Sequence, residues 1–155
     1  MVAVTRSWPQ ATGPRSSPQR GDALVTALEV NHPGGNLSYR VDYRGKAVVF
    51  ATDHEHGTER DGQLEKFAYG ADVMIYDAMY SEDEYRGHGG PPKIGWGHST
   101  WQHAAKIADA AKVKQLLLYH HDPTRTDAAL DGIVKQVRRL RPEAIAAREG
   151  QTIKL

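Results

Sequence analysis

Three short apolar runs in this chain each lead into a residue that can bind a metal ion. The runs and the residues they lead to are Leu28–Val30 with His32, Ala47–Phe50 with Asp53, and Gln115–Tyr119 with His120. Such runs are typical of buried strands, and strand ends in an α/β sheet meet at one edge, where sites tend to lie. We therefore predict that His32, Asp53 and His120 meet at one rim and bind zinc or a similar divalent ion. Three unrelated polar strand ends are the alternative.

The composition limits the classes of protein to which the chain can belong. With 155 residues, 39% of them hydrophobic and 25% charged, it is expected to form one globular domain. It has no cysteine, which excludes disulfides, thiolate zinc sites and cysteine nucleophiles. The formal net charge of +1 predicts no broad attraction to nucleic acid or membranes. No apolar run reaches the roughly 18 residues of a membrane span, and the expected location is cytoplasmic.

The N-terminal segment, residues 1–22, is predicted to be a disordered tail that precedes the folded domain at 23–155. Pro9, Pro14 and Pro18 interrupt it, and Ser, Thr and Arg are frequent in the rest. It lacks the apolar stretch of a secretory signal. Order is therefore expected to begin near Ala23.

The remaining pattern predicts an α/β fold in which an antiparallel hairpin leads into alternating strands and helices. The predicted strands are Leu24–Val30, Leu37–Tyr43, Lys46–Thr52, Asp72–Asp77, Leu116–Tyr119, Ala144–Ala147 and Thr152–Leu155. The predicted helices are Gly62–Tyr69, one that begins after Ser99, and one that begins at Asp127 and ends before Pro142.

Two local patterns refine this expectation. The residues predicted to cap the helices are Asp61, Ser99 and Asp127. In the second strand, Leu37, Tyr39 and Val41 alternate with polar residues. This alternation predicts that the face carrying these three side chains is buried.

Four motifs, in this order along the chain, resemble those of one hydrolase family. They are Asn31–Val41 (NHPGGNLSYRV), Val48–Asp53 (VVFATD), Gly95–Trp101 (GWGHSTW) and Leu116–Pro123 (LLLYHHDP). Together, with the predicted strands and helices between them, they resemble the metallo-β-lactamase fold hydrolases, in the branch that includes ribonuclease Z and related phosphodiesterases. The resemblance extends over roughly residues 24–155, nearly all of the chain that is predicted to be ordered.

The resemblance implies a fold, a cofactor and roles for five residues. In the family, a four-layered αββα sandwich holds two metal ions, usually zinc, at one rim. By resemblance, His32 would bind the first metal, Asp53 would bridge both, and His120 would bind the second. His98 matches a histidine that assists proton transfer and phosphate stabilisation in the phosphodiesterase branch. Asp77 stands where that branch usually carries a glutamate, and the shorter acid weakens the expected coupling to His98.

The chain departs from the family in one respect that matters for the metal. The family's H-x-H-x-D-H motif, which supplies further ligands upstream of the His32 motif, is absent from these 155 residues. The chain therefore resembles the C-terminal half of the fold. We expect half of the αββα sandwich, a mixed sheet with helices on one face. With His32, Asp53 and His120 as the remaining family ligands, we expect one weakly bound metal or none, with Zn²⁺, Mn²⁺ or iron as candidates.

The resemblance implies that the complete fold catalyses metal-assisted hydrolysis of a phosphodiester, in nucleic acid or a nucleotide. Without the missing motif, the chain alone is expected to be inactive. Two alternatives remain open, a non-catalytic truncated remnant and a half-domain completed by a second copy or another chain. Half a sandwich would expose the inner face of its sheet, which favours association. A nucleic-acid binding module is disfavoured by the net charge of +1.

The other histidines are predicted to lie outside the metal site. We expect His54, His56 and His88 in exposed loops, His103 on the surface of a helix, and His121 pointing away from the rim.

The site residues also have simple structural alternatives. His32 could cap the turn formed by the Pro-Gly-Gly sequence that follows it, and Asp53 could be an ordinary turn residue. His98 could bond its own backbone at the start of a helix. The sequence alone leaves these alternatives open.

Overall fold

The computed structural model describes residues 15–20 and 23–155, and within them the chain forms one seven-stranded mixed sheet and four helices. The strands are β1 (Arg15–Arg20), β2 (Ala23–Val30), β3 (Asn36–Tyr43), β4 (Lys46–Ala51), β5 (Val73–Asp77), β6 (Gln115–Tyr119) and β7 (Ile145–Ala146). The helices are α1 (Arg60–Ala68), α2 (Glu82–Arg86), α3 (Trp101–Ala110) and α4 (Asp127–Val137). The strands lie side by side in chain order, antiparallel from β1 to β4 and parallel from β4 to β7.

The predicted hairpin and the predicted alternation of strands and helices are both present. β3 and β4 pair around a two-residue turn, with Tyr43 opposite Lys46. Helix α1 connects β4 to β5, α2 and α3 connect β5 to β6, and α4 connects β6 to β7. Because these connections carry the chain back to the same end of the sheet, the carboxyl ends of β4, β5 and β6 lie at one rim.

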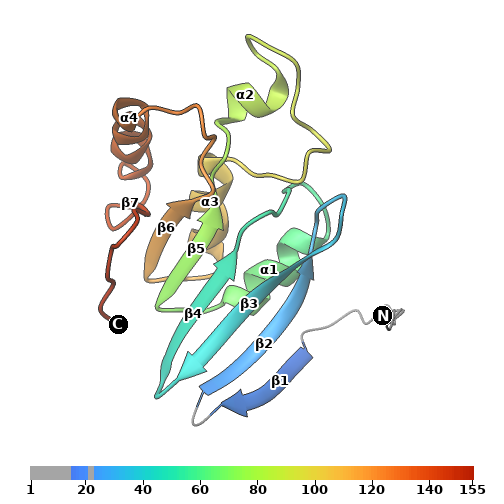
Figure 1. Ribbon diagram of the computed structural model, residues 1–155, viewed down its shortest axis with the longest axis vertical. Coiled ribbons are helices and arrows are strands. Elements are labelled where there is room, and N and C mark those ends of the chain that lie inside the picture. The colour runs from blue at the N-terminus through green and yellow to red at the C-terminus, as the bar shows by residue number, and fades with distance from the viewer. Residues whose placement is uncertain (1–14, 21–22) are drawn as a thin grey trace, which may run out of the picture.

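One face of the sheet is covered by α1 and α3, while no helix of the described residues covers the other face (Figure 1). Val49, Met74 and Leu116, from β4, β5 and β6, are fully buried on the covered face. They form one core with Leu64 of α1 and Ala108 of α3. The predicted fold class, an α/β mixed sheet with helices on one face, is confirmed.

The prediction that Leu37, Tyr39 and Val41 face the core is wrong. These side chains are 39%, 42% and 37% exposed, whereas Ser38 between the first two is fully buried. The helices pack on the opposite face of β3, so the apolar row lies on the open face, together with the 41% exposed Phe50 of β4. Alternation shows which side chains share a face, but it does not show which face is covered.

The prediction of a disordered segment over residues 1–22 is wrong for residues 15–20, which form β1. This strand pairs antiparallel with β2, with Ser16 opposite Thr26. The register shifts between Ser17 and Arg20, where Pro18 lies, and an edge strand tolerates a proline at such an irregularity. Backbone pairing needs no apolar side chain, so the composition gave no indication of this strand. Residues 1–14 and 21–22 lie outside the described part of the chain.

The helices begin one or two residues away from the predicted caps. The residues at the N-caps of α1, α3 and α4 are Glu59, Thr100 and Thr126, in place of Asp61, Ser99 and Asp127. Ser99 is unavailable as a cap because its N–H donates to Asp77 and its hydroxyl bonds His56. Thr100 accepts the His103 N–H instead.

Two further elements differ from the sequence prediction. Helix α2 was not predicted, although its capping box is present as Ser81 and Glu84, each of whose side chains accepts the other's backbone N–H. The strand predicted over Thr152–Leu155 is not formed, because these residues pair with no neighbour. Among the described residues, no helix has the length and apolarity needed to cross a membrane.

Candidate metal centre

The ends of three strands bring the predicted metal ligands to one rim of the sheet. His32 follows β2, Asp53 follows β4, and His120 follows β6 directly. His120 Nε2 lies 3.3 Å from Asp53 Oδ1. In each of two groups, His32–Asp53–His98 and Asp77–His98–His120, one ligand atom from every residue lies within 4.8 Å of the others. Because His98 belongs to both groups, the five residues form one continuous set of imidazoles and carboxylates, which we call the rim.

Two rim residues adopt backbone conformations that residues with a Cβ rarely take. The φ angle is 52° at Asp53 and 55° at His120, both in the left-handed region. Such a conformation costs about 1–3 kcal/mol, and strain of this kind gathers at functional sites. The same conformation also occurs at Arg44 and Lys112, so it favours a functional role for Asp53 and His120 only together with their place among the other rim side chains.

Asp77, at the end of β5, holds its neighbours at the rim in place through hydrogen bonds. Its side chain is fully buried. Its carboxylate accepts the backbone N–H groups of Asp53 (2.9 Å), Met79 (3.1 Å) and Ser99 (3.2 Å), and Oδ2 lies 3.0 Å from His98 Nδ1. A carboxylate offers about four lone-pair positions, which these contacts occupy. Asp77 therefore holds its neighbours in place and has no free oxygen for a metal.

His98 is oriented by Asp77, even though an aspartate is shorter than the glutamate of the family pattern. The hydrogen bond to Asp77 raises the pKa of His98 above its ordinary value, against the effect of burial, which lowers it. An Nδ1–H that donates to the carboxylate leaves Nε2 as the atom available for proton transfer. The His98 ring also stacks on His120, with ring centroids 4.9 Å apart. An imidazole that is oriented in this way could take part in acid–base chemistry.

His32 is held from two sides by glycine backbone. The Gly34 N–H donates to His32 Nδ1 at 3.1 Å, so the imidazole does cap the turn, as the simple alternative expected. A Cβ at Gly97 would lie only 2.2 Å from His32 Cδ2, so the bare Gly97 backbone, at φ +90°, packs directly against the ring. One lone pair serves either an N–H or a metal, so the turn and a metal would compete for Nδ1.

Glu55, which was not among the predicted site residues, is a buried acid beside the rim. Its side chain is 5% exposed and accepts the Tyr85 hydroxyl (2.7 Å) and the N–H groups of Gly95 (2.5 Å) and Gly97 (2.8 Å). Burial raises the pKa of this carboxyl, but the hydrogen bonds outweigh burial and hold the pKa below its ordinary value. The partners lie far along the chain, so the sequence showed only an acid between two histidines.

A second group of histidines, His54, His56 and His103, lies behind the rim and is called the rear cluster. The predictions that these side chains are exposed are wrong, since they are 0%, 13% and 10% exposed. Helices α1 and α3 close over the segment that follows β4. His54 Nδ1 accepts the Asn31 N–H at 3.2 Å, and Nε2 lies 3.0 Å from Asp61. His54 thereby fixes the backbone beside the first predicted ligand.

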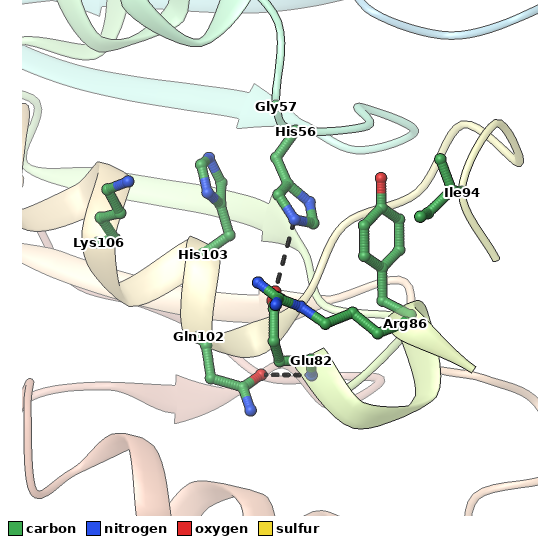
Figure 2. Close-up of a pocket in the computed structure, with 9 residues that line it drawn as sticks. His56, Gly57, Glu82, Arg86, Ile94, Gln102, His103 and Lys106 are labelled. Atoms are coloured by element: carbon green, nitrogen blue, oxygen red, sulfur yellow. Dashed lines mark hydrogen bonds and ion pairs between the residues drawn. The ribbon is translucent and has the colours of Figure 1, made fainter. Parts of the chain in front are cut away.

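The rear cluster borders a pocket of about 530 Å³ between α2 and α3 (Figure 2). The rings of His56 and His103 stack, with centroids 4.5 Å apart, and Figure 2 shows Glu82 of α2 beside them. Burial lowers the pKa of His103 to about 4 and also lowers that of His56. His103 Nε2 is buried without a hydrogen-bond partner. At neutral pH both imidazoles are therefore uncharged.

The remaining two histidines lie outside the rim and the rear cluster. The His88 side chain is 68% exposed, as predicted, and pairs with Asp83. The ring nitrogens of His121 are buried, and burial lowers the pKa of this imidazole below its ordinary value. In the described part of the chain, His121 joins neither group of metal-binding side chains.

The donor set of the rim fits a divalent ion of the zinc type. Imidazole nitrogen and carboxylate oxygen are ligands that zinc accepts, and catalytic zinc sites use three protein ligands with open positions. His32, Asp53 and His120 would supply three such ligands, with His98 beside them. The fit is better at the Asp53–His120 pair than at His32, whose Nδ1 already serves a turn.

Comparison with known proteins connects this geometry to a family. A family model described as "Beta-lactamase superfamily domain" matches residues 6–121. Ribonuclease Z of Thermoplasma acidophilum is 32% identical over 98 residues, 59% of this chain. The metallo-beta-lactamase fold protein YhfI from Bacillus subtilis has a TM-score of 0.68 at 19% identity over 88% of this chain. Human tRNase Z, short form, has a TM-score of 0.67 at 19% identity over 92% of this chain.

The chain spans only part of the length of these proteins. The match covers 29% of the Thermoplasma ribonuclease Z, 51% of the Bacillus protein and 46% of the human protein. At 19% identity, the two solved structures show a shared fold and leave the activity open.

Proposed function

Because the chain belongs to the beta-lactamase superfamily domain family, in its ribonuclease Z-like branch, we propose that it forms part of a metal-dependent hydrolase that cleaves phosphodiester bonds in nucleic acid or a nucleotide. One observation carries this proposal. His120 Nε2 lies 3.3 Å from Asp53 Oδ1, beside the His98 imidazole that Asp77 orients. Imidazoles and carboxylates gathered in this way are what metal-assisted hydrolysis requires.

Each rim residue has a distinct role in this proposal. His32, Asp53 and His120 would hold the metal, which when bound would polarise the phosphate and lower the pKa of water to about 7. His98, whose pKa Asp77 raises, would carry a proton on Nε2 for the leaving oxygen or steady the charge that develops on the phosphate. Asp77 would keep the His98 ring in its orientation and is thus a positioning residue.

We further propose that these 155 residues alone bind zinc weakly and show no turnover. The H-x-H-x-D-H motif is absent from them, and the matched part of the relatives is between 29% and 51% of their length. Loss of supporting ligands typically costs 10–100-fold in metal affinity. The rim on its own is then a partial site that needs further ligands.

Zinc titration by calorimetry, followed by an assay with bis(p-nitrophenyl) phosphate, tests these proposals. We expect one weak zinc site, lost in Asp53→Ala and in His120→Ala, and hydrolysis at background. His88→Ala is the matched control, because His88 is exposed and lies outside the rim. It should bind zinc as the unaltered chain does.

Two results would change the proposal. Two tightly held zinc ions, with turnover that both substitutions abolish, would show that the chain is a complete enzyme. Zinc binding that survives both substitutions would remove Asp53 and His120 from the site and would favour the non-catalytic remnant.

A second candidate role, a half-domain completed by a second copy or another chain, is favoured by the open face of the sheet. Tyr39, Phe50 and Tyr119 on this face are 42%, 41% and 43% exposed. The rings of Phe50 and Tyr119 lie 6.0 Å apart, so the exposed apolar surface is continuous between β4 and β6. Contiguous apolar surface of this kind marks interaction sites.

Light scattering coupled to size exclusion tests the half-domain role. We expect a mass well above the 17.1 kDa of one chain, and a return to that mass in Phe50→Lys. Leu140→Lys is the control, because Leu140 is 64% exposed but lies beyond the sheet, after α4. A monomer in the unaltered chain would count against completion by a second copy.

A further inference from the structure

The loop between α2 and α3 presents a tryptophan to solvent beside the rim. Trp96 is 54% exposed, whereas Trp101, five residues later, is 7% exposed. Single exposed apolar side chains are common on protein surfaces. Trp96 differs from such cases because the glycines on both sides of it adopt left-handed conformations, with Gly95 at φ 85° and Gly97 at φ 90°, and each donates its N–H to a buried carboxylate.

Buried Glu55 holds the loop in this conformation. Its carboxylate accepts the Gly95 N–H at 2.5 Å and the Gly97 N–H at 2.8 Å, on either side of Trp96. Burying a carboxylate is unfavourable unless hydrogen bonds compensate. The chain nevertheless places the buried Glu55 carboxylate under a loop whose tryptophan side chain is exposed. Stability alone would favour an indole packed in the core. The arrangement instead indicates an indole that is presented for binding.

Trp96 lies close to the groups that would carry out the reaction. Gly97 packs against the His32 ring, and His98 is the next residue. Consecutive Cα atoms are 3.8 Å apart, so the Cα atoms of Trp96 and His98 lie within about 8 Å of each other. The Trp96 backbone therefore lies next to the rim residues His32 and His98.

Lys93 adds a positive charge to the same loop. Its Nζ lies 4.2 Å from the centroid of the Trp96 ring. Trp96 and Lys93, which we call the platform, thus combine an aromatic surface and a cation beside the rim.

We propose that Trp96 and Lys93 bind a nucleotide, with Trp96 stacking on the nucleobase next to the scissile phosphate and Lys93 pairing with a phosphate oxygen. An exposed aromatic ring stacks on any unpaired base, and a neighbouring cation neutralises the backbone. The inference rests on the proposed function for the bond that is cleaved. It extends that function by assigning the substrate class: nucleoside phosphates and unpaired strands, in preference to phosphodiesters without a base.

Nuclear magnetic resonance of the indole N–H signals tests the platform on the full chain. The chain has three tryptophans, so Trp96→Phe identifies the Trp96 signal by its loss. Adenosine 5′-monophosphate should shift that signal in a saturable way and leave the signal of buried Trp101 in place. Ribose 5-phosphate, which lacks the base, should bind roughly 10-fold more weakly or not at all.

Substitutions then separate the two parts of the platform. Trp96→Ala should weaken binding of adenosine 5′-monophosphate roughly 10-fold or more, and Trp96→Tyr should retain it. Lys93→Ala should weaken binding of the monophosphate and leave adenosine unaffected. An unchanged melting temperature is expected for Trp96→Ala, since the side chain is exposed. Undiminished binding in Trp96→Ala, or equal binding of ribose 5-phosphate, would overturn the proposal.

The nucleotide-binding result does not depend on whether the chain hydrolyses phosphodiesters, because binding is measured without added metal. Nucleotide binding through Trp96, with no hydrolysis under any metal, would support the platform and count against the proposed activity. Hydrolysis of bis(p-nitrophenyl) phosphate, with no effect of adenosine 5′-monophosphate on Trp96, would support the activity and overturn the platform.

Discussion

The rim and the rear cluster use the same side chain in opposite ways. At the rim, His98 and His120 are 16% and 32% exposed and each lies beside the carboxylate of an aspartate. In the rear cluster, Asp61 lies 3.0 Å from His54 Nε2 and 3.7 Å from His103 Nε2, but burial has the largest effect on the pKa values of His103 and His56 and lowers both. The pKa therefore moves in opposite directions, upward at His98 and downward at His103. The surroundings of each ring therefore set its pKa, even though both groups of histidines lie at the same edge of the sheet.

The two regions are also mechanically connected. His54 of the rear cluster bonds the N–H of Asn31, next to His32, and His56 bonds the hydroxyl of Ser99, next to His98. The rear cluster thus supports the backbone from which two rim residues project. We expect substitutions in the rear cluster to affect mainly stability, and substitutions in the rim to affect mainly metal binding.

The largest expected effect comes from removing His54. In His54→Ala, a fully buried ring is lost and the Asn31 N–H is left unpaired, which should lower the free energy of unfolding by about 3–5 kcal/mol. Urea denaturation measures this loss. His120→Ala, at the rim, and His88→Ala, in an exposed loop, should each cost less than about 1 kcal/mol. Equal losses in His54→Ala and His120→Ala would remove the distinction between the two regions.

Acid should destabilise the protein through the rear cluster. The pKa of His103 falls on folding from 6.5 to about 4, so between these values the unfolded chain binds more protons than the folded one. Stability should therefore fall as the pH drops from 6.5 towards 4, by at most about 3 kcal/mol. Denaturation curves across this range measure the slope, which His103→Gln should flatten.

The rim should show the opposite dependence on pH. The pKa of His98 is raised on folding, so its contribution to stability is complete below 6.5 and is lost as the pH rises through the folded pKa. His98 therefore cannot cause a loss of stability at acid pH. A loss of stability in acid that persists unchanged in His103→Gln would therefore have to be assigned to another group, with His56 as the next candidate.

The rim residues could be predicted from the sequence more readily than the residues that support them. The supporting residues have bonding partners that lie far away in the sequence. His32, Asp53 and His120 each end a local apolar run, and such runs are readable without knowledge of the tertiary fold. His54 and Glu55 look like loop residues because the groups that cover and bond them come from α1 and from residues 95–97. Polar residues become buried only through such distant partners.

The covered face of the sheet and strand β1 were also predicted wrongly, because both depend on contacts between distant parts of the chain. The alternation of Tyr39 with polar neighbours gave the correct pairing of side chains on one face, but the choice of covered face depends on where α1 and α3 pack. β1 was missed because an edge strand can be held by backbone pairing to β2, which leaves no apolar pattern in Ser16 and Ser17.

A smaller effect should come from the contact between Gly97 and His32. Gly97→Ala places a Cβ 2.2 Å from the His32 ring, whereas Gly89, at φ +97°, has open space around it. Both substitutions carry the strain of a left-handed conformation, about 1–3 kcal/mol. We expect Gly97→Ala to cost about 1 kcal/mol more than Gly89→Ala, because the ring must move. Zinc binding should weaken only in Gly97→Ala, and an equal loss of affinity in both variants would argue against His32 as a ligand.

The smallest expected effect concerns the left-handed backbone of the rim residue His120. His120 has φ 55°, so a glycine there relieves strain, while an alanine removes the imidazole and keeps the strain. His120→Gly should therefore be more stable than His120→Ala by up to about 1 kcal/mol, although both variants lose the ligand for zinc. The neighbouring Tyr119, in the regular strand β6, should show the reverse order, because glycine weakens a strand. Thermal denaturation of the four variants measures both differences. If alanine proved more stable at both positions, the left-handed conformation of His120 would not be strained, and its unusual backbone would no longer point to function.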